Sequence, residues 1–145
     1  MTSLHHLPVR ELMTTALVTI HPEASIAEAV ETMRTADIRH LPVVDRRGRL
    51  LAIVSDRDLL HLAGKGKHAA HRVEEVMTRD VVSVAPGTLA REAAALLIDN
   101  KIGALPVLDD ELALVGVVTE TDFLRLIVET LGGAGIPASA RRGGR

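Results

Sequence analysis

The pattern of apolar and polar residues along the chain predicts two helices with one apolar face, one in each half of the chain. The first predicted helix begins at Ser25, and the spacing of Ser25 and Glu28 is that of a capping box, in which each side chain satisfies a free backbone N–H. Positions i, i+3, i+4 and i+7 form its apolar face, which consists of Ile26, Ala29, Val30 and Met33. One face of this helix is therefore expected to be buried.

Short apolar runs flank this helix and predict strands. Leu17–Ile20 is expected to be a short strand that Pro22 ends. Leu41–Val44 and Leu50–Val54 are expected to form a hairpin across a polar turn, with Pro42 at a strand start or on an edge because proline donates no hydrogen bond. A second helix is expected to start directly after Val54. Each unit therefore reads strand, helix, strand, strand, helix.

The same order returns 64 residues later. Residues 9–60 align with residues 73–124 without a gap, and 17 of the 52 pairs are identical. The second copy predicts Thr88 as a helix cap and an apolar face of Ala90, Ala93, Ala94 and Leu97. It also predicts strands at Leu105–Leu108 and Leu114–Val118 and a helix over Thr119–Leu124. The chain is a tandem duplication.

The repeat predicts an α+β fold in which two β-α-β-β-α units pack around a pseudo-two-fold axis. A unit of about 50 residues buries too little surface to be stable alone, so each needs the other. The expected boundaries are 1–64 for the first repeat with an N-terminal lead, 65–131 for a linker and the second repeat, and 132–145 for a disordered tail. A short polar helix is expected in the linker through His71.

Composition narrows the function. The chain is 47% hydrophobic and 25% charged with a formal net charge of −2, has no cysteine, and has Phe123 as its sole aromatic residue. Disulfides and thiolate chemistry are excluded, and nucleic acid is an improbable partner because neither a basic field nor stacking residues are present. No apolar run approaches the length that spans a bilayer, and no secretory signal is visible. A cytoplasmic protein is expected.

Metal and catalytic sites are not expected. His68 and His71 have helical spacing and His5 and His6 are adjacent, but no acidic residue stands at zinc-site spacing, so solvated histidines are the favoured interpretation. No nucleophile, base and orienting residue assemble, and phosphate-loop and hydrolase motifs are absent. The chain is expected not to be an enzyme.

Three sequence elements, each occurring twice, resemble those of the CBS (cystathionine-beta-synthase) domain. They are V-x-E-x-M-T, I-x-x-L-P-V-x-D, and an apolar strand that ends in S/T-x-x-D. The resemblance covers residues 9–63 and 73–127. It implies a compact regulatory module that binds an adenosine-type ligand (AMP, ATP or S-adenosylmethionine) in clefts between the halves, with no required cofactor. It also implies a homodimer and an effector protein that reads the signal.

Two interpretations of the Ser55-x-x-Asp58 and Thr119-x-x-Asp122 turns stay open. Hydroxyl and carboxylate at this spacing cap a helix N-terminus. The same helix N-terminus attracts phosphate, and a carboxylate beside it accepts hydrogen bonds from ribose hydroxyls. The two roles are compatible.

The resemblance assigns the residues of each cleft, which pairs one half's Leu-Pro-Val strand with the other half's turn. The first cleft is expected to contain Thr15, Ile38, Arg39, His40, Thr119 and Asp122. The second is expected to contain Arg79, Ile102, Gly103, Ala104, Ser55, Arg57 and Asp58. Arg57 is the expected phosphate partner, since a guanidinium donates two parallel hydrogen bonds.

One departure from the family pattern bears on the clefts. Ala52 replaces a glycine that the second copy keeps as Gly116, and its methyl group is expected to narrow one cleft. A module with empty clefts that serves only in structure or oligomerisation is the alternative function.

Overall fold

The computed structural model describes residues 4–63 and 71–132, which include both repeats. The first repeat contains α1 (Ile26–Ala36), β1 (His40–Val44), β2 (Leu50–Ser55) and α2 (Asp56–Ala63). The second contains α3 (Ala90–Asn100), β3 (Ala104–Leu108), β4 (Leu114–Thr119) and α4 (Glu120–Thr130). Short 3-10 turns precede them at Leu4–His6, Val9–Glu11 and Val73–Glu75. The α+β class is confirmed, whereas the linker helix expected before His71 and the tail from residue 133 lie outside the described residues.

Each repeat holds one two-stranded antiparallel sheet, as the hairpin pattern predicts. Leu41 lies opposite Val54 in the first sheet, and Leu105 lies opposite Val118 in the second. The strand expected at Leu17–Ile20 is wrong in extent, because Ile20 alone bridges to β1 through two backbone hydrogen bonds of 3.0 and 2.9 Å. Pro22 lies two residues further on and has no N–H to donate, so the pairing cannot extend past His21.

The predicted side-chain cap is present at the start of α1 but not at the start of α3. Ser25 Oγ accepts the Glu28 N–H at 3.0 Å, as predicted, and of the predicted face only Val30 is exposed, at 43%. The predicted Thr88 cap is wrong. Thr88 Oγ1 accepts the Ala85 N–H instead, because the repeat register places Leu89 at the cap position.

The apolar core is divided between the repeats, and each half is completed by a segment that precedes the other repeat. Val9 is fully buried among residues of the second core, and Val73 is fully buried among residues of the first. Met13 likewise packs on the second core and Met77 on the first. The sequence division at residue 64 therefore separates each repeat from part of its core.

Backbone hydrogen bonds hold these exchanged leads (residues 7–15 and 71–79). Thr14 pairs with Val117 of β4, and the equivalent Thr78 pairs with Ile53 of β2. Leu7 O accepts the first N–H of α3 at 2.7 Å, while His71 O accepts that of α1 at 3.1 Å. Each lead thus caps a helix and extends a sheet in the repeat to which it does not belong in sequence.

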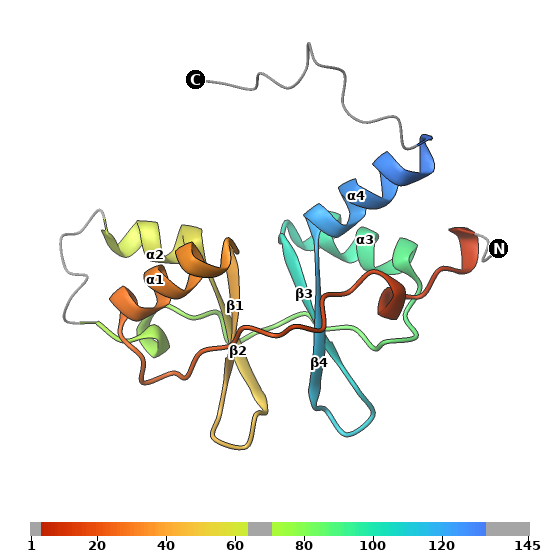
Figure 1. Ribbon diagram of the computed structural model, residues 1–145. Coiled ribbons are helices and arrows are strands. Elements are labelled where there is room, and N and C mark those ends of the chain that lie inside the picture. Colours follow the sequence, from red (N-terminus) through yellow and green to blue (C-terminus); the bar gives the residue numbers. More distant parts are fainter. Residues whose placement is uncertain (1–3, 64–70, 133–145) are drawn as a thin grey trace, which may run out of the picture.

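The pseudo-two-fold axis passes between the hairpins. Arg49 and Ala113 are equivalent positions of the repeat, and they form an antiparallel bridge with one another. Figure 1 shows the helices on one side of the module and the two hairpin turns side by side on the opposite side. Within residues 4–63 and 71–132, the helices are too short or too polar to cross a membrane.

Candidate functional site

The turn from β2 into α2 is a reciprocal capping box. The Asp58 N–H donates to Ser55 Oγ at 3.2 Å, and the Ser55 N–H donates to Asp58 Oδ2 at 2.9 Å. Both side chains are half-buried. The capping interpretation of this motif is therefore confirmed.

The equivalent turn into α4 is more deeply buried. Asp122 is 8% exposed, and its Oδ2 accepts both the backbone N–H of Thr119 at 2.8 Å and the Thr119 hydroxyl at 3.3 Å. Oδ1 lies 3.7 Å from the Arg125 guanidinium. In both repeats the backbone N–H of the capping turn donates to Oδ2, and Oδ1 accepts no backbone hydrogen bond.

The N-terminus of α2 does not present the free N–H groups that the sequence predicts for phosphate. The Asp56 N–H donates to Arg39 O at 2.9 Å, and the Arg57 N–H donates to Asp56 Oδ1 at 2.8 Å. Ser55 Oγ accepts the third N–H of the helix, that of Asp58. A phosphate that bound at this helix start would therefore have to displace a protein acceptor. At α4, the Glu120 N–H is bonded to Gly103 O at 3.1 Å.

The exchanged leads place the two outlying predicted residues beside the strands that precede the turns. Thr14 pairs with Val117 of β4, and Thr78 pairs with Ile53 of β2. Because both bridges are antiparallel, the chain continues through Thr15 and Arg79 in the direction away from the turns. Both residues are exposed. Their membership of the two clefts stays a prediction.

His40 is the cleft residue that crosses between the repeats. Its ring lies against Gly103 of the second repeat, close to the Glu120 side chain. Burial lowers the pKa of His40, and the nearby carboxylates of Asp56, Glu120 and Asp58 oppose that shift. The imidazole is therefore kept largely neutral at neutral pH, and it remains both a donor and an acceptor.

The remaining predicted residues sit on the strand side of each turn. Ile38 and Ile102 are half-buried against the core of their own repeats, Arg39 and Arg57 are exposed, and Ala104 is buried opposite Thr119. His40 similarly lies opposite Ser55. Within the described part of the chain, no hydrogen bond or ion pair joins the strand residues of one repeat to the capping turn of the other.

Ala52 does not act as the sequence predicts. It is fully buried in the first core, so its methyl group fills that core and does not open onto a cleft. At the equivalent Gly116, a β-carbon would come within 2.5 Å of Met13 Sδ. Glycine at this position therefore leaves room for the Met13 side chain.

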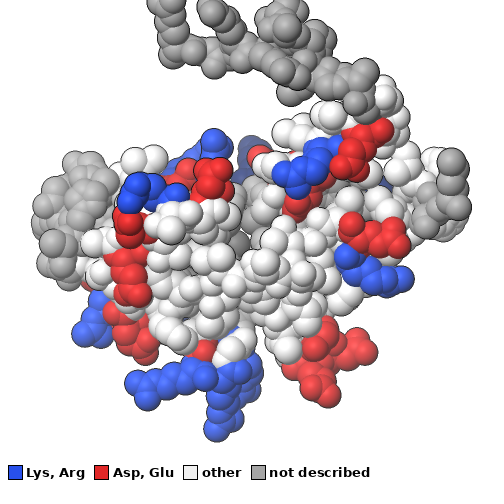
Figure 2. All heavy atoms as spheres, viewed as in Figure 1, with Lys and Arg blue, Asp and Glu red and all other residues white. Residues whose placement is uncertain are grey.

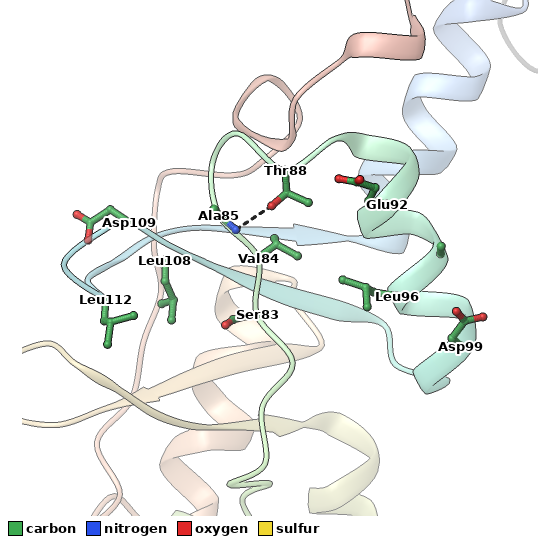
Figure 3. A pocket seen from close by; sticks show the side chains of 11 residues that line it. Ser83, Val84, Ala85, Thr88, Glu92, Leu96, Asp99, Leu108, Asp109 and Leu112 are labelled. Atoms are coloured by element: carbon green, nitrogen blue, oxygen red, sulfur yellow. Dashed lines mark hydrogen bonds between the residues drawn. The ribbon is translucent and has the colours of Figure 1, made fainter.

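The structure also contains pockets that the sequence prediction of the site missed. One lies on the second repeat between α3 and the segment before it, and it includes Glu92, Asp99 and Asp109 (Figure 3). None of the predicted cleft residues lines it. The sequence contains one indication of this pocket. The two hairpin turns stand at equivalent positions of the repeat and have opposite net charge.

Metal binding finds no support among the described histidines. His71 Nδ1 lies 3.0 Å from Glu75 Oε1, and no group of three or more potential ligands gathers within residues 4–63 and 71–132. His68 lies outside these ranges.

Solved structures with this arrangement of elements are CBS domain pairs. The pair of protein MJ0100, solved in complex with 5-methylthioadenosine and S-adenosyl-L-methionine, superposes with a TM-score of 0.79 at 30% identity, covering 85% of this chain and 97% of that one. CBSX2, solved in complex with AMP, gives a TM-score of 0.77 at 29% identity over 86% and 98% of the two chains.

Among curated proteins, a CBS domain-containing protein of Dictyostelium discoideum is 33% identical over 135 residues, which is 85% of this chain and 92% of that protein. An inosine-5'-monophosphate dehydrogenase of Methanocaldococcus jannaschii is 35% identical over 115 residues, but the match spans only 22% of its length. The enzymes among the relatives match only through their CBS part, so their catalysis is not carried over.

The CBS domain model matches residues 9–65 and 73–129. Each match begins at the lead valine and includes one hairpin and the S/T-x-x-D turn. The chain therefore belongs to the CBS domain family, as a tandem pair.

Proposed function

We propose that this CBS pair is a regulatory module that binds an adenosine-type ligand in its two clefts and passes the signal to a partner protein. The observation that carries the proposal is the pair of equivalent aspartates. Each of Asp58 and Asp122 uses Oδ2 to cap a helix and is oriented by that capping, while Oδ1 accepts no backbone hydrogen bond.

The chemistry of the clefts suits a nucleoside. A carboxylate held in place accepts hydrogen bonds from ribose hydroxyls. Half-buried Ile38 and Ile102 offer aliphatic surfaces to an adenine ring, since no aromatic residue lies in either cleft. The structures of MJ0100 with S-adenosyl-L-methionine and of CBSX2 with AMP support the same ligand class.

Isothermal titration calorimetry with AMP, ATP and S-adenosylmethionine tests this assignment. Asp58→Asn and Asp122→Asn keep a capping oxygen but remove the charge, so each is expected to weaken one cleft. A charge-assisted hydrogen bond contributes about 1.5–3 kcal/mol, which corresponds to a loss of roughly ten- to a hundredfold in affinity. The double variant is expected to bind none of the three.

The matched controls are Asp45→Asn and Asp109→Asn. These carboxylates also accept backbone hydrogen bonds, from two N–H groups each, but they lie in the hairpin turns. They should leave affinity unchanged. Equal affinity in all variants would refute the ribose role, and absence of binding in the wild type would favour a purely structural module.

We also propose a homodimer that forms through the helix side of the module. Leu124, Ile127, Val128 and Leu131 follow one another at i, i+3, i+4 and i+7, and they are 62%, 51%, 47% and 81% exposed. Leu60 of α2, the equivalent of Leu124, is 69% exposed. A contiguous apolar stripe on this scale is typical of an interface.

Sedimentation equilibrium tests the dimer. The wild type is expected to have twice the chain mass at micromolar concentration, and Leu124→Glu with Ile127→Glu is expected to return it to one chain mass. The exposed but isolated Leu4→Glu serves as the control. A wild type with one chain's mass would contradict the proposal.

A further inference from the structure

The two hairpin turns have the same fold and opposite charge. The basic turn is Asp45-Arg46-Arg47-Gly48-Arg49, and the acidic turn, at equivalent positions, is Asp109-Asp110-Glu111-Leu112-Ala113. The Arg49–Ala113 bridge holds them side by side. Figure 2 shows the blue and red side chains next to one another at the edge farthest from the helices.

The charges at the tips of both turns have no ion-pair partner among the described residues. Asp45 and Asp109 each accept two N–H groups of their own turn, which fixes the turn. Arg46 and Arg47, like Asp110 and Glu111, are exposed, and their side chains form no ion pair with another residue of 4–63 or 71–132. Arg49 Nε, in contrast, lies 3.7 Å from Asp45 Oδ2.

Beside each turn the surface is hollowed, and the two pockets differ in charge as the turns do. The basic pocket is formed by His21, Glu23, Asp45, Arg46, Arg47 and Arg49. The acidic pocket combines Glu92, Asp99 and Asp109 with apolar Val84, Leu96 and Leu108 (Figure 3), and no described lysine or arginine lines it. An arginine fits such a pocket, because its apolar stem covers carbon while its guanidinium pairs with carboxylates.

Symmetry makes a second copy of this chain the matching partner. A two-fold axis perpendicular both to the pseudo-two-fold axis and to the line that joins the turns sets the basic turn of each copy opposite the acidic turn of the other. The contact is then made twice, and both charge pairs are attractive. A two-fold axis along the line that joins the turns would instead oppose like charges.

We propose that two copies of this chain associate edge to edge, with the basic turn of each against the acidic turn and acidic pocket of the other. The two turns lie on the side of the module opposite the helices, and the acidic pocket extends from Asp109 to α3. None of the α4 residues of the helix-side dimer and none of the predicted cleft residues lines this pocket, so the surface is distinct from both. Contacts of this kind are individually weak and are screened by salt. The association is therefore expected at low ionic strength and at high protein concentration.

Charge reversal with rescue tests the proposal. Arg46→Glu with Arg47→Glu makes both turns acidic, and Asp110→Arg with Glu111→Arg makes both turns basic. Each variant alone should repel itself, whereas an equimolar mixture should associate. The variant that carries all four substitutions exchanges the charges of the two turns at unchanged net charge. It should associate again, but more weakly than the wild type, because the acidic pocket stays beside the turn that has become basic.

Sedimentation equilibrium at about 20 mM and about 300 mM salt provides the measurement, since the Debye length falls several-fold between them. We expect the wild-type mass at low salt to be about twice its value at high salt, and the dissociation constant of the edge-to-edge association to rise at least tenfold in each reversed variant. A mass of two chains at high salt reports the helix-side dimer, so the two associations are separated. Retention of the low-salt doubling by both reversed variants, or failure of natively folded variants to associate on mixing, would overturn the proposal. So would a wild-type mass that does not change with salt.

Discussion

The imidazole of His40 lies so close to Gly103 that a β-carbon on Gly103 would come within 2.9 Å of His40 Cε1 and 3.1 Å of Nε2. The two residues come from different repeats. Arg39 occupies the position equivalent to Gly103, so the contact exists on one side of the pseudo-two-fold axis only. This single close approach makes the two clefts chemically different.

Gly103→Ala is expected to destabilise the protein through that contact. Overpacking of this kind costs roughly 1–3 kcal/mol, and the cost should largely disappear in a His40→Ala background, because the clash is with the imidazole. Urea unfolding of the four proteins in the double-mutant cycle measures the coupling. Gly87→Ala is the control, since its β-carbon would meet Arg10 at an ordinary 3.7 Å. If the two substitutions have additive effects on the free energy of unfolding, His40 and Gly103 are not in contact in solution.

Stability is expected to fall as the pH drops below about 6.5, the ordinary pKa of histidine. Burial holds the pKa of His40 lower in the folded state than in the unfolded chain, so the unfolded state takes up the proton first. The contribution of neutral His40 is present above the unfolded pKa and is lost as the pH falls toward the folded pKa. Urea unfolding at pH 7.5 and pH 5.5 measures it, and His40→Gln should flatten the difference. If the stability of the His40→Gln variant falls between pH 7.5 and pH 5.5 by as much as that of the wild type, other groups cause the pH dependence.

Fragments can test the exchanged leads. Residues 16–80 retain Val73 and Met77 with the first core, whereas residues 1–64 retain Val9, which belongs to the second. The first fragment should therefore show more helical circular dichroism and a steeper thermal transition than the second. The reverse order would mean that the repeat as read from the sequence is the folding unit.

Ser25→Ala is expected to cost about 1 kcal/mol of unfolding free energy, because Ser25 Oγ accepts the Glu28 N–H at 3.0 Å at the start of α1. Thermal or urea unfolding measures the loss. Ser83→Ala removes an exposed hydroxyl outside any helix and should be neutral. Equal effects of the two substitutions would contradict the capping role.

Residue spacing predicted the features that depend on residues close together in sequence. The hairpins follow from apolar runs on either side of a polar turn, and the capping carboxylates of Asp58 and Asp122 follow from a three-residue spacing that any helix start obeys. These features depend on residues close in sequence, so the chain order carries them. The strand at Leu17–Ile20 failed because pairing depends on what lies beside it.

Long-range partners could not be predicted in the same way. A duplicated chain offers each lead two similar cores, and nothing in Val9 or Val73 distinguishes them. The choice depends on how far each lead reaches and on which helix start needs an acceptor for its first N–H. The acidic pocket was missed for a related reason, since its carboxylates come from α3 and from the turn after β3 and converge only on folding.

The exchanged leads also set an order of events at the ribosome. The segment around Val9 is made first, yet the strand that it joins, β4, ends at Thr119. At about 5–20 residues per second, translation leaves roughly 5–20 s during which this apolar segment has no native partner. The first repeat, in contrast, gains Val73 soon after its own strands emerge. Translation therefore produces a first half that can close early, followed by a second half that must recruit a segment made before the first half.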